Sequence, residues 1–199
     1  KVGEAPEDEN TSPEAIRIQL RRSLVRMRTD YVDVYYLHRY DPDTEPHAVA
    51  RAMGEELRAG TIRAWGVSNY TAAQLAALLA AAADEGVPAP ALCQPALSML
   101  NTGALEELLP LCEKEGVGVV PYQLLQGGML TGKYRRGQEA PAGSRLAEKP
   151  EWMKPFTDET YDVIERCAAE AATEGVTMTQ HALRWALAQP GVVSALVGG

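Results

Sequence analysis

Apolar and polar positions along the chain follow two periodicities in turn. Short segments rich in β-branched and aromatic residues predict strands. Between them lie longer segments whose apolar residues recur every three or four positions, as on one face of a helix. The predicted strands cover residues 31–38, 62–67, 92–94, 117–122 and 192–197. Because one or more predicted helices separate each strand from the next, the pattern indicates an α/β fold of parallel strands with right-handed crossovers.

The predicted helices have recognisable ends. Ser12 before Pro13 is typical of an N-cap followed by proline at the first helical position, and Thr71 with Gln74 is a capping-box pair. Glycines 60, 86, 116 and 175 are expected to end four of the helices. The first helix is expected to bury one apolar stripe: Ile16, Leu20, Leu24 and Met27. Residues 123–155 are rich in Gly and Pro and predict a long loop, which in a compact domain is either functional or disordered.

Residues capable of chemistry stand at the carboxyl end of nearly every predicted strand. They are His38, Ser68 with Asn69, Gln94, Tyr122 and the final Gly198-Gly199. In a parallel barrel these ends share one face, where active sites are built. An open doubly wound sheet would gather its ligand groups at one switch point, commonly beside a G-x-G-x-x-G loop that this sequence lacks. The spread over all five ends favours a (β/α)8 barrel, and the open sheet remains the alternative.

Each of these residues also has an ordinary structural interpretation. Tyr122 could belong to the core, Gln94 and Asn69 could satisfy loop backbone, and Lys133 and Arg145 could be solvated charges of the long loop. The histidines His47 and His181, inside helical patterns, are expected to be structural.

Composition excludes several classes of partner. The chain has 199 residues, 19 basic and 27 acidic, for a net charge of −8, which argues against nucleic acid and anionic membranes. No run of about 18 apolar residues predicts a membrane helix. The three widely spaced cysteines are interpreted as reduced, buried thiols, and a cytoplasmic location follows from that. We expect no metal ion, and oligomeric state leaves no trace in the sequence.

Taken in order, the motifs resemble the aldo-keto reductase family over almost the whole chain. They lie in residues 12–13, 23–24, 29–33, 37–38, 60–63, 66–69, 94, 116–122, 128–134, 144–145 and 196–198. The D-Y-x-D…H strand and the G-x-x-R…G-V-S-N strand are specific to that family. The Gly-Lys-Tyr and Ser-Arg pairs resemble the branch of bacterial reductases and potassium-channel β-subunits. The resemblance implies one barrel domain over residues 1–199, truncated at both ends and comprising approximately strands 4 to 8 of a partial (β/α)8 TIM barrel.

The resemblance also implies a reaction and a set of site residues. Hydride passes from a reduced nicotinamide to an aldehyde or ketone carbonyl while a tyrosine gives the proton. His38 matches the histidine that orients the carbonyl, and Lys1 matches the lysine that lowers the tyrosine's pKa. The cofactor, NADPH with NADH not excluded, would be held by residues that match family positions. Ser68, Asn69 and Gln94 match contacts to the carboxamide, Tyr122 the stacking aromatic, Lys133 and Arg145 the phosphate and ribose contacts, and Gly198 a contact to the adenosine end.

Two departures from the family pattern leave a second hypothesis open. Gln123-Leu124 replaces the usual Ser-Pro after the stacking aromatic, so we expect a different pyrophosphate contact. The catalytic aspartate and tyrosine are expected upstream of Lys1, since none of the eight tyrosines takes that place, and both ends of the chain look cut. We therefore expect a reductase as the complete protein and inactivity of this chain alone. The alternative is a nucleotide-binding regulatory subunit or an inactive remnant of the same fold.

Overall fold

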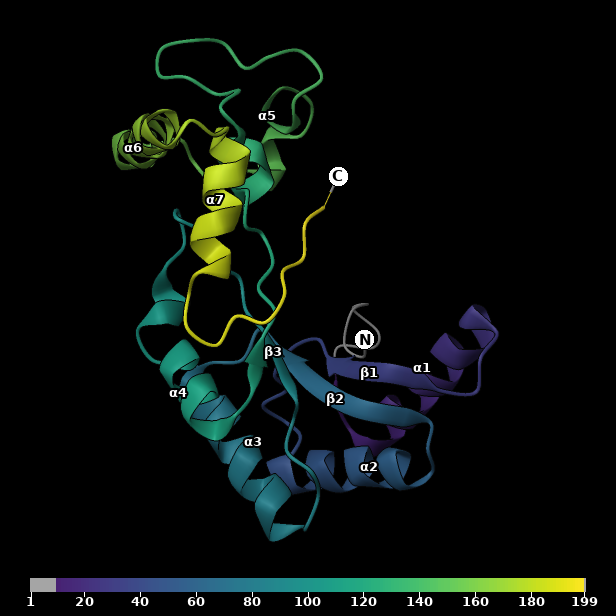
Figure 1. Ribbon diagram of the computed structural model, residues 1–199. Helices are drawn as coiled ribbons and strands as arrows, with labels where there is room; N and C mark the ends of the chain where they lie inside the picture. Colours follow the sequence, from purple (N-terminus) through teal and green to yellow (C-terminus); the bar gives the residue numbers. More distant parts are fainter. Residues whose placement is uncertain (1–9, 199) are drawn as a thin grey trace. The chain divides into compact units, whose positions relative to one another are not determined.

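The computed structural model describes residues 10–198 of the chain, as a parallel α/β arrangement followed by irregular structure and two helices (Figure 1). Lys1, predicted as a catalytic residue, and Gly199 lie outside the described residues. The elements are α1 (Pro13–Met27), β1 (Val32–Leu37), α2 (Pro46–Arg58), β2 (Ile62–Ser68), α3 (Ala72–Asp84), β3 (Leu92–Gln94), η2 (Gly103–Leu105), α4 (Leu108–Glu115), β4 (Gly118–Val119), η3 (Gln126–Thr131), α5 (Arg145–Glu148), η4 (Pro150–Trp152), α6 (Asp158–Glu174) and α7 (Met178–Leu187).

The described chain forms two compact units, each with its own internal contacts. The first, the sheet unit, consists of residues 10–95 and 107–119. The second, the cavity unit, consists of residues 96–106 and 120–198. The expectation of a single barrel domain stays a prediction.

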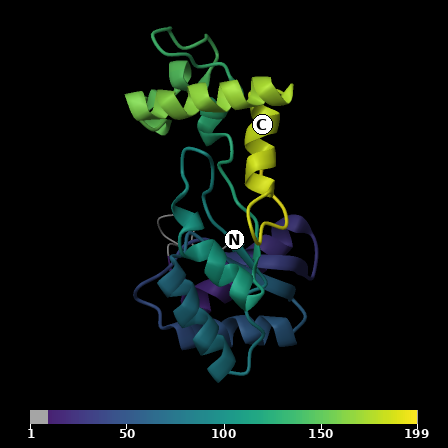
Figure 2. The same cartoon turned by 60° about the vertical axis from the view of Figure 1, so that its left-hand side comes forward.

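In the sheet unit, four parallel strands lie side by side in chain order, β1-β2-β3-β4. The register pairs Tyr36 with Gly66 and Ser68 with Gln94. Helices α1 to α4 lie along one face of this sheet, as Figures 1 and 2 show. Consecutive order without a reversal, with the helices on one face, is the pattern of a barrel segment and lacks the switch point of a doubly wound sheet. Closure into a barrel stays a prediction.

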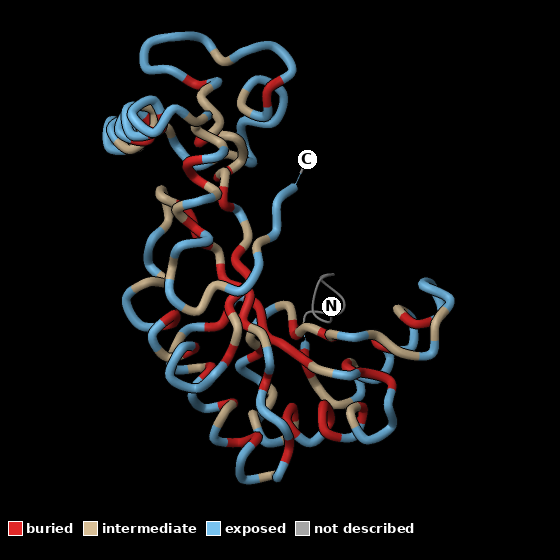
Figure 3. Tube along the Cα trace, in the orientation of Figure 1, coloured by how far each residue is buried: buried red, intermediate tan, exposed pale blue. Residues whose placement is uncertain are grey.

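Alternation along the strands divides the sheet unit into two faces. Figure 3 shows buried stretches along the strands of this unit. They include Tyr35 and Leu37 of β1, Trp65 of β2 and Cys93 of β3, which are at most 3% exposed. The apolar stripes of the helices meet them. Burying large side chains of this kind is worth about 1.5–3 kcal/mol each, which is why the helical face forms the core of the unit. The opposite face presents the even-numbered positions of β1, which are only partly buried.

Local signals set the helix boundaries as the sequence predicts. Ser12 caps α1 by accepting from the Ala15 amide, and Thr71 with Gln74 forms the expected capping box at α3. A second capping box, Thr177 with Gln180, opens α7. Helices α4 and α6 end where Gly116 and Gly175 take left-handed backbone, which glycine adopts without a Cβ clash.

The cavity unit is built around helices α6 and α7 and the irregular segment 120–157. Two small clusters hold it together. Met129, Tyr134 and Ile164 form the first, and Leu130, Cys167 and Ala182 form the second. The long loop is therefore ordered by packing rather than by regular hydrogen bonding, and it contains η3, α5 and η4.

Three expectations about elements are wrong. Met27 is 54% exposed, because α1 ends there and its buried face stops at Leu24. The strand predicted at 117–122 is reduced to Gly118–Val119. No strand forms at 192–197 within the described chain. In that segment the Leu196 amide donates a hydrogen bond to the Pro121 carbonyl, and Val193 and Val197 are exposed. Residues of high β-propensity form a strand only where a neighbouring strand offers backbone hydrogen bonds. The expected neighbour, β4, ends before Pro121, so residues 192–197 have no strand to pair with.

All three cysteines are buried and free, as expected. Among the residues that the structure describes, no helix has the length and apolar character needed to cross a membrane.

Candidate functional site

The carboxyl ends of β1, β2 and β3 bring four predicted site residues together in the sheet unit. His38 follows β1, Ser68 ends β2, Asn69 follows it, and Gln94 ends β3. Because the strands are parallel and in register, these residues lie at the same edge. Ser68 and Gln94 are buried, at 1% and 3% exposed.

Hydrogen bonds between neighbouring strand ends tie this group together. Asn69 Nδ2 donates to the His38 carbonyl at 2.8 Å and to Ser68 Oγ at 3.3 Å. Ser68 Oγ in turn donates to the Gln94 carbonyl at 2.9 Å. Asn69 has a φ of 60°, a left-handed backbone that asparagine tolerates better than most residues. The edge is therefore a preorganised set of polar groups.

Tyr36 belongs to this edge although it was not among the predicted site residues. It stands two positions before His38, on the same face of β1, and its hydroxyl is hydrogen-bonded by Gln94. Burial raises the pKa of Tyr36, and the hydrogen bond with Gln94 acts against this shift. Its ring lies against Gly66, where a Cβ would come within 2.7 Å of both Tyr36 Cε1 and the Leu92 carbonyl oxygen. The period of two along the strand was the signal that pointed to this residue.

Asp41, also absent from the predictions, fastens the segment that follows His38. Its carboxylate accepts from the Thr11 amide at 2.8 Å, the Asp43 amide at 3.0 Å and Thr44 Oγ1 at 2.6 Å. Burial alone would raise the pKa of Asp41, but these hydrogen bonds outweigh it and lower the pKa below its ordinary value. The Asx-turn pattern of Asp41 and Asp43 was the available sequence signal.

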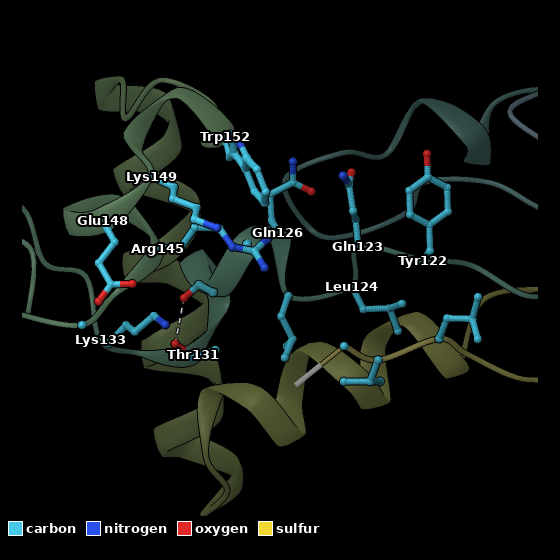
Figure 4. A pocket seen from close by; sticks show the side chains of 17 residues that line it. Tyr122, Gln123, Leu124, Gln126, Thr131, Lys133, Arg145, Glu148, Lys149 and Trp152 are labelled. Atoms are coloured by element: carbon cyan, nitrogen blue, oxygen red, sulfur yellow. Dashed lines mark hydrogen bonds between the residues drawn. The ribbon is translucent and has the colours of Figure 1, made fainter. Parts of the chain in front are cut away.

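The cavity unit contains the other predicted site residues, around a cavity of about 750 Å³ (Figure 4). Tyr122, Lys133, Arg145 and Gly198 all line it. Pockets for small molecules have volumes of roughly 300–1,000 Å³, so this one has the size of a ligand site. Its lining includes three basic residues, Lys133, Arg145 and Lys149, and one acidic residue, Glu148, so it is positive in a chain of net charge −8.

Irregular backbone brings the cations close to the floor of the cavity. Gln123, Gln126, Gly127 and Gly128 all have positive φ. At Gly128 a Cβ would come within 2.8 Å of Lys133 Nζ, and at Gly127 it would come within 3.7 Å of Arg145 Cδ. A side chain at position 128 would therefore displace Lys133, whereas a side chain at position 127 would displace Met153, whose Sδ would be 2.8 Å away, and would only touch Arg145. A positive cradle of this kind suits phosphate oxygens.

In sum, the structure separates the predicted residues into two groups. His38, Ser68, Asn69 and Gln94 meet at the edge of the sheet unit, and Tyr122, Lys133, Arg145 and Gly198 surround the cavity of the second unit. Polar side chains such as those of the first group can hold a planar amide, and cations over glycine backbone such as those of the second can hold a diphosphate.

Comparison with known proteins assigns the class. The model of the Aldo/keto reductase family matches residues 1–199, and the chain therefore belongs to that family. This confirms the resemblance drawn from the sequence motifs.

The relatives include both kinds of protein that the motifs indicate, namely bacterial reductases and potassium-channel β-subunits. A probable voltage-gated potassium channel subunit beta from Oryza sativa subsp. japonica is 33% identical over 98% of this chain and 61% of its own length. The NADH-specific methylglyoxal reductase of Escherichia coli is 33% identical over 100% of this chain and 59% of its own. Among solved structures, the glycerol dehydrogenase of Gluconobacter oxydans has a TM-score of 0.77 at 28% identity, covering 94% of this chain and 55% of that one. The chain thus spans less than two thirds of the length of these relatives.

Proposed function

We propose that the protein to which this chain belongs is an oxidoreductase that uses NADPH to reduce an aldehyde or ketone to an alcohol. The observation that supports this most directly is the positive cavity of the cavity unit, whose glycine floor suits a diphosphate. NADH remains possible as the cofactor, because a relative is an NADH-specific methylglyoxal reductase. The substrate is a small carbonyl compound, and the location is cytoplasmic.

The site residues that the structure describes take roles that their positions support. A bound reduced nicotinamide would supply the hydride. Ser68, Asn69 and Gln94 would hold its carboxamide, which fixes the ring face that meets the carbonyl. Tyr122 would stack on the ring, and His38 would donate a hydrogen bond to the carbonyl oxygen and so polarise it.

The remaining roles concern the phosphates and the proton. Lys133 and Arg145 would bind the phosphate oxygens, and Gly198 would lie against the adenosine end. Lys1 would lower the pKa of the proton-donating tyrosine. We assign that tyrosine to none of the eight in this chain.

The first test is nucleotide binding by this chain. Isothermal titration with NADPH should show binding, and Arg145→Ala should weaken it about tenfold to a hundredfold, since one charge-assisted hydrogen bond is worth roughly 1.5–3 kcal/mol. Arg166→Ala is the matched control, because Arg166 is an exposed arginine of α6 outside the cavity lining. Absence of binding, or equal effects of the two variants, would contradict the proposal.

The second test is activity of the natural protein that contains this chain. We expect NADPH oxidation that depends on an added aldehyde, and a lower kcat in His38→Ala. The observation that favours a second function is the match to proteins named probable voltage-gated potassium channel subunit beta in Oryza sativa subsp. japonica and Arabidopsis thaliana. A nucleotide-binding regulatory subunit would bind NADPH tightly without substrate-dependent oxidation.

A further inference from the structure

An exposed aromatic side chain at the cavity has no evident structural task. Trp152, at the end of η4, is 65% exposed although it is among the residues that line the cavity. Large aromatic residues normally bury 150–250 Å² when they stabilise a fold. Lys149 Nζ lies 4.3 Å from the centroid of its ring, in a cation–π arrangement that orients the indole without covering it.

The short segment that bears Trp152 is nevertheless anchored. The next residue, Met153, packs against the cluster of Met129, Tyr134 and Ile164. A Cβ on Gly127 would come within 2.8 Å of the Met153 Sδ, so the segment contacts the floor of the cavity directly. The indole is therefore held at the cavity while most of its surface stays open to a ligand.

Figure 4 shows Tyr122 at one end of the cavity and Trp152 close to Gln126 and Arg145, with Gln123 between Tyr122 and this group. A dinucleotide consists of two planar ring systems joined through a charged diphosphate. With its nicotinamide at Tyr122 and its diphosphate beside Arg145, its second ring system would lie within reach of Trp152.

We propose that Trp152 is the stacking surface for the adenine base of the dinucleotide, and that Lys149 positions the indole for it. The inference rests on the proposed function. It adds a binding residue that the family motifs did not indicate. Base–aromatic stacking is worth enough that its loss on truncation to alanine is readily measured.

The test compares ring and non-ring substitutions in this chain. ADP-ribose, which contains the adenine base and the diphosphate without the nicotinamide, is titrated calorimetrically at several salt concentrations. Trp152→Ala and Trp152→Leu should weaken its binding about fivefold to a hundredfold, whereas Trp152→Phe should retain most of the affinity. Because stacking involves no ion release, the salt dependence should stay that of the unsubstituted chain, whereas Arg145→Ala should reduce it.

Fluorescence gives a second readout. ADP-ribose should quench tryptophan emission in the unsubstituted chain and in Trp185→Phe, but not in Trp152→Phe, since Trp185 lies outside the cavity lining. Affinity within twofold in Trp152→Ala, or equal retention by Leu and Phe, would overturn the inference while leaving the proposed function intact. Failure of the unsubstituted chain to bind either NADPH or ADP-ribose would overturn both.

Discussion

In the sheet unit the polar residues at the strand ends satisfy one another, whereas in the cavity unit the basic residues lie exposed over irregular backbone. Ser68 and Gln94 are almost fully buried and linked by a hydrogen bond. Lys133 and Arg145 are exposed, and glycines with positive φ lie beneath them. Uncharged polar side chains that are fixed at the ends of hydrogen-bonded strands can fix the orientation of an uncharged planar group. Exposed cations are suited to anions, which pull them into place on binding.

The difference also concerns what stabilises each region. In the sheet unit the site residues directly follow strands whose other face is the core, so the geometry of the site depends on core packing. In the cavity unit the site residues lie on loops and 3-10 turns held by two small clusters. Substitutions in the core should therefore disturb the geometry of the strand-end group. Substitutions of the cavity residues should change the free energy of unfolding much less.

The largest effect is expected from the core directly beneath the strand-end site. Leu37 is fully buried and immediately precedes His38. Leu37→Ala should lower the free energy of unfolding by about 2–5 kcal/mol, from lost burial and the cavity left behind. Urea denaturation followed by circular dichroism measures it.

The control for that substitution is Val25→Ala, at a position 77% exposed on α1. It should change the free energy of unfolding by no more than about 0.5 kcal/mol. A similar small loss in Leu37→Ala would mean that the strand ends do not depend on core packing.

The comparison also explains what could be predicted from the sequence. The common location of His38, Ser68 and Gln94 could be predicted from the periodicity of the strands, because parallel strands bring their carboxyl ends to one edge of the sheet. The bonds from Asn69 to the His38 carbonyl and from Ser68 to the Gln94 carbonyl could not be predicted, since they depend on the exact register of backbone groups.

The cavity was less predictable. Lys133 and Arg145 were indicated only by family motifs, because loop conformation depends on tertiary packing such as Met153 against Gly127. Trp152 was not predicted at all, since one aromatic residue in a loop has no periodic pattern around it. The strand expected at 192–197 failed for a related reason, because a ladder partner is a property of the fold and not of the segment.

A second prediction concerns Asp41, which fastens the segment after His38. Its pKa is lower in the folded protein than its ordinary value of 3.8, so folding favours the charged form. The stabilisation is fully present above that value and is lost as the pH falls through the lower folded-state pKa. Asp41→Asn should cost about 1–3 kcal/mol at neutral pH, and the difference from the unsubstituted chain should shrink as the pH falls below 3.8.

Urea denaturation at a series of pH values measures this difference. Asp43→Asn is the matched control, because the exposed Asp43 side chain has no part in the bonds to Thr11 and Thr44. A loss in Asp41→Asn that stays constant down to low pH would show that the carboxylate charge does not matter.

The smallest effect gives the most direct comparison of the two units, because the same capping box occurs once in each. Thr71 and Gln74 open α3 with bonds of 2.9 and 3.2 Å, and Thr177 and Gln180 open α7 with the same two distances. Thr71→Ala and Thr177→Ala should each cost about 1 kcal/mol, whereas Thr→Ser at either position should cost less, because serine keeps the accepting oxygen.

Native-state hydrogen exchange of the α3 and α7 amides measures each unit separately. If both substitutions lower the protection of both helices equally, the units unfold as one. If Thr177→Ala lowers protection in α7 alone, the cavity unit opens by itself, and the loops around the cavity can rearrange around a ligand while the strand ends stay fixed.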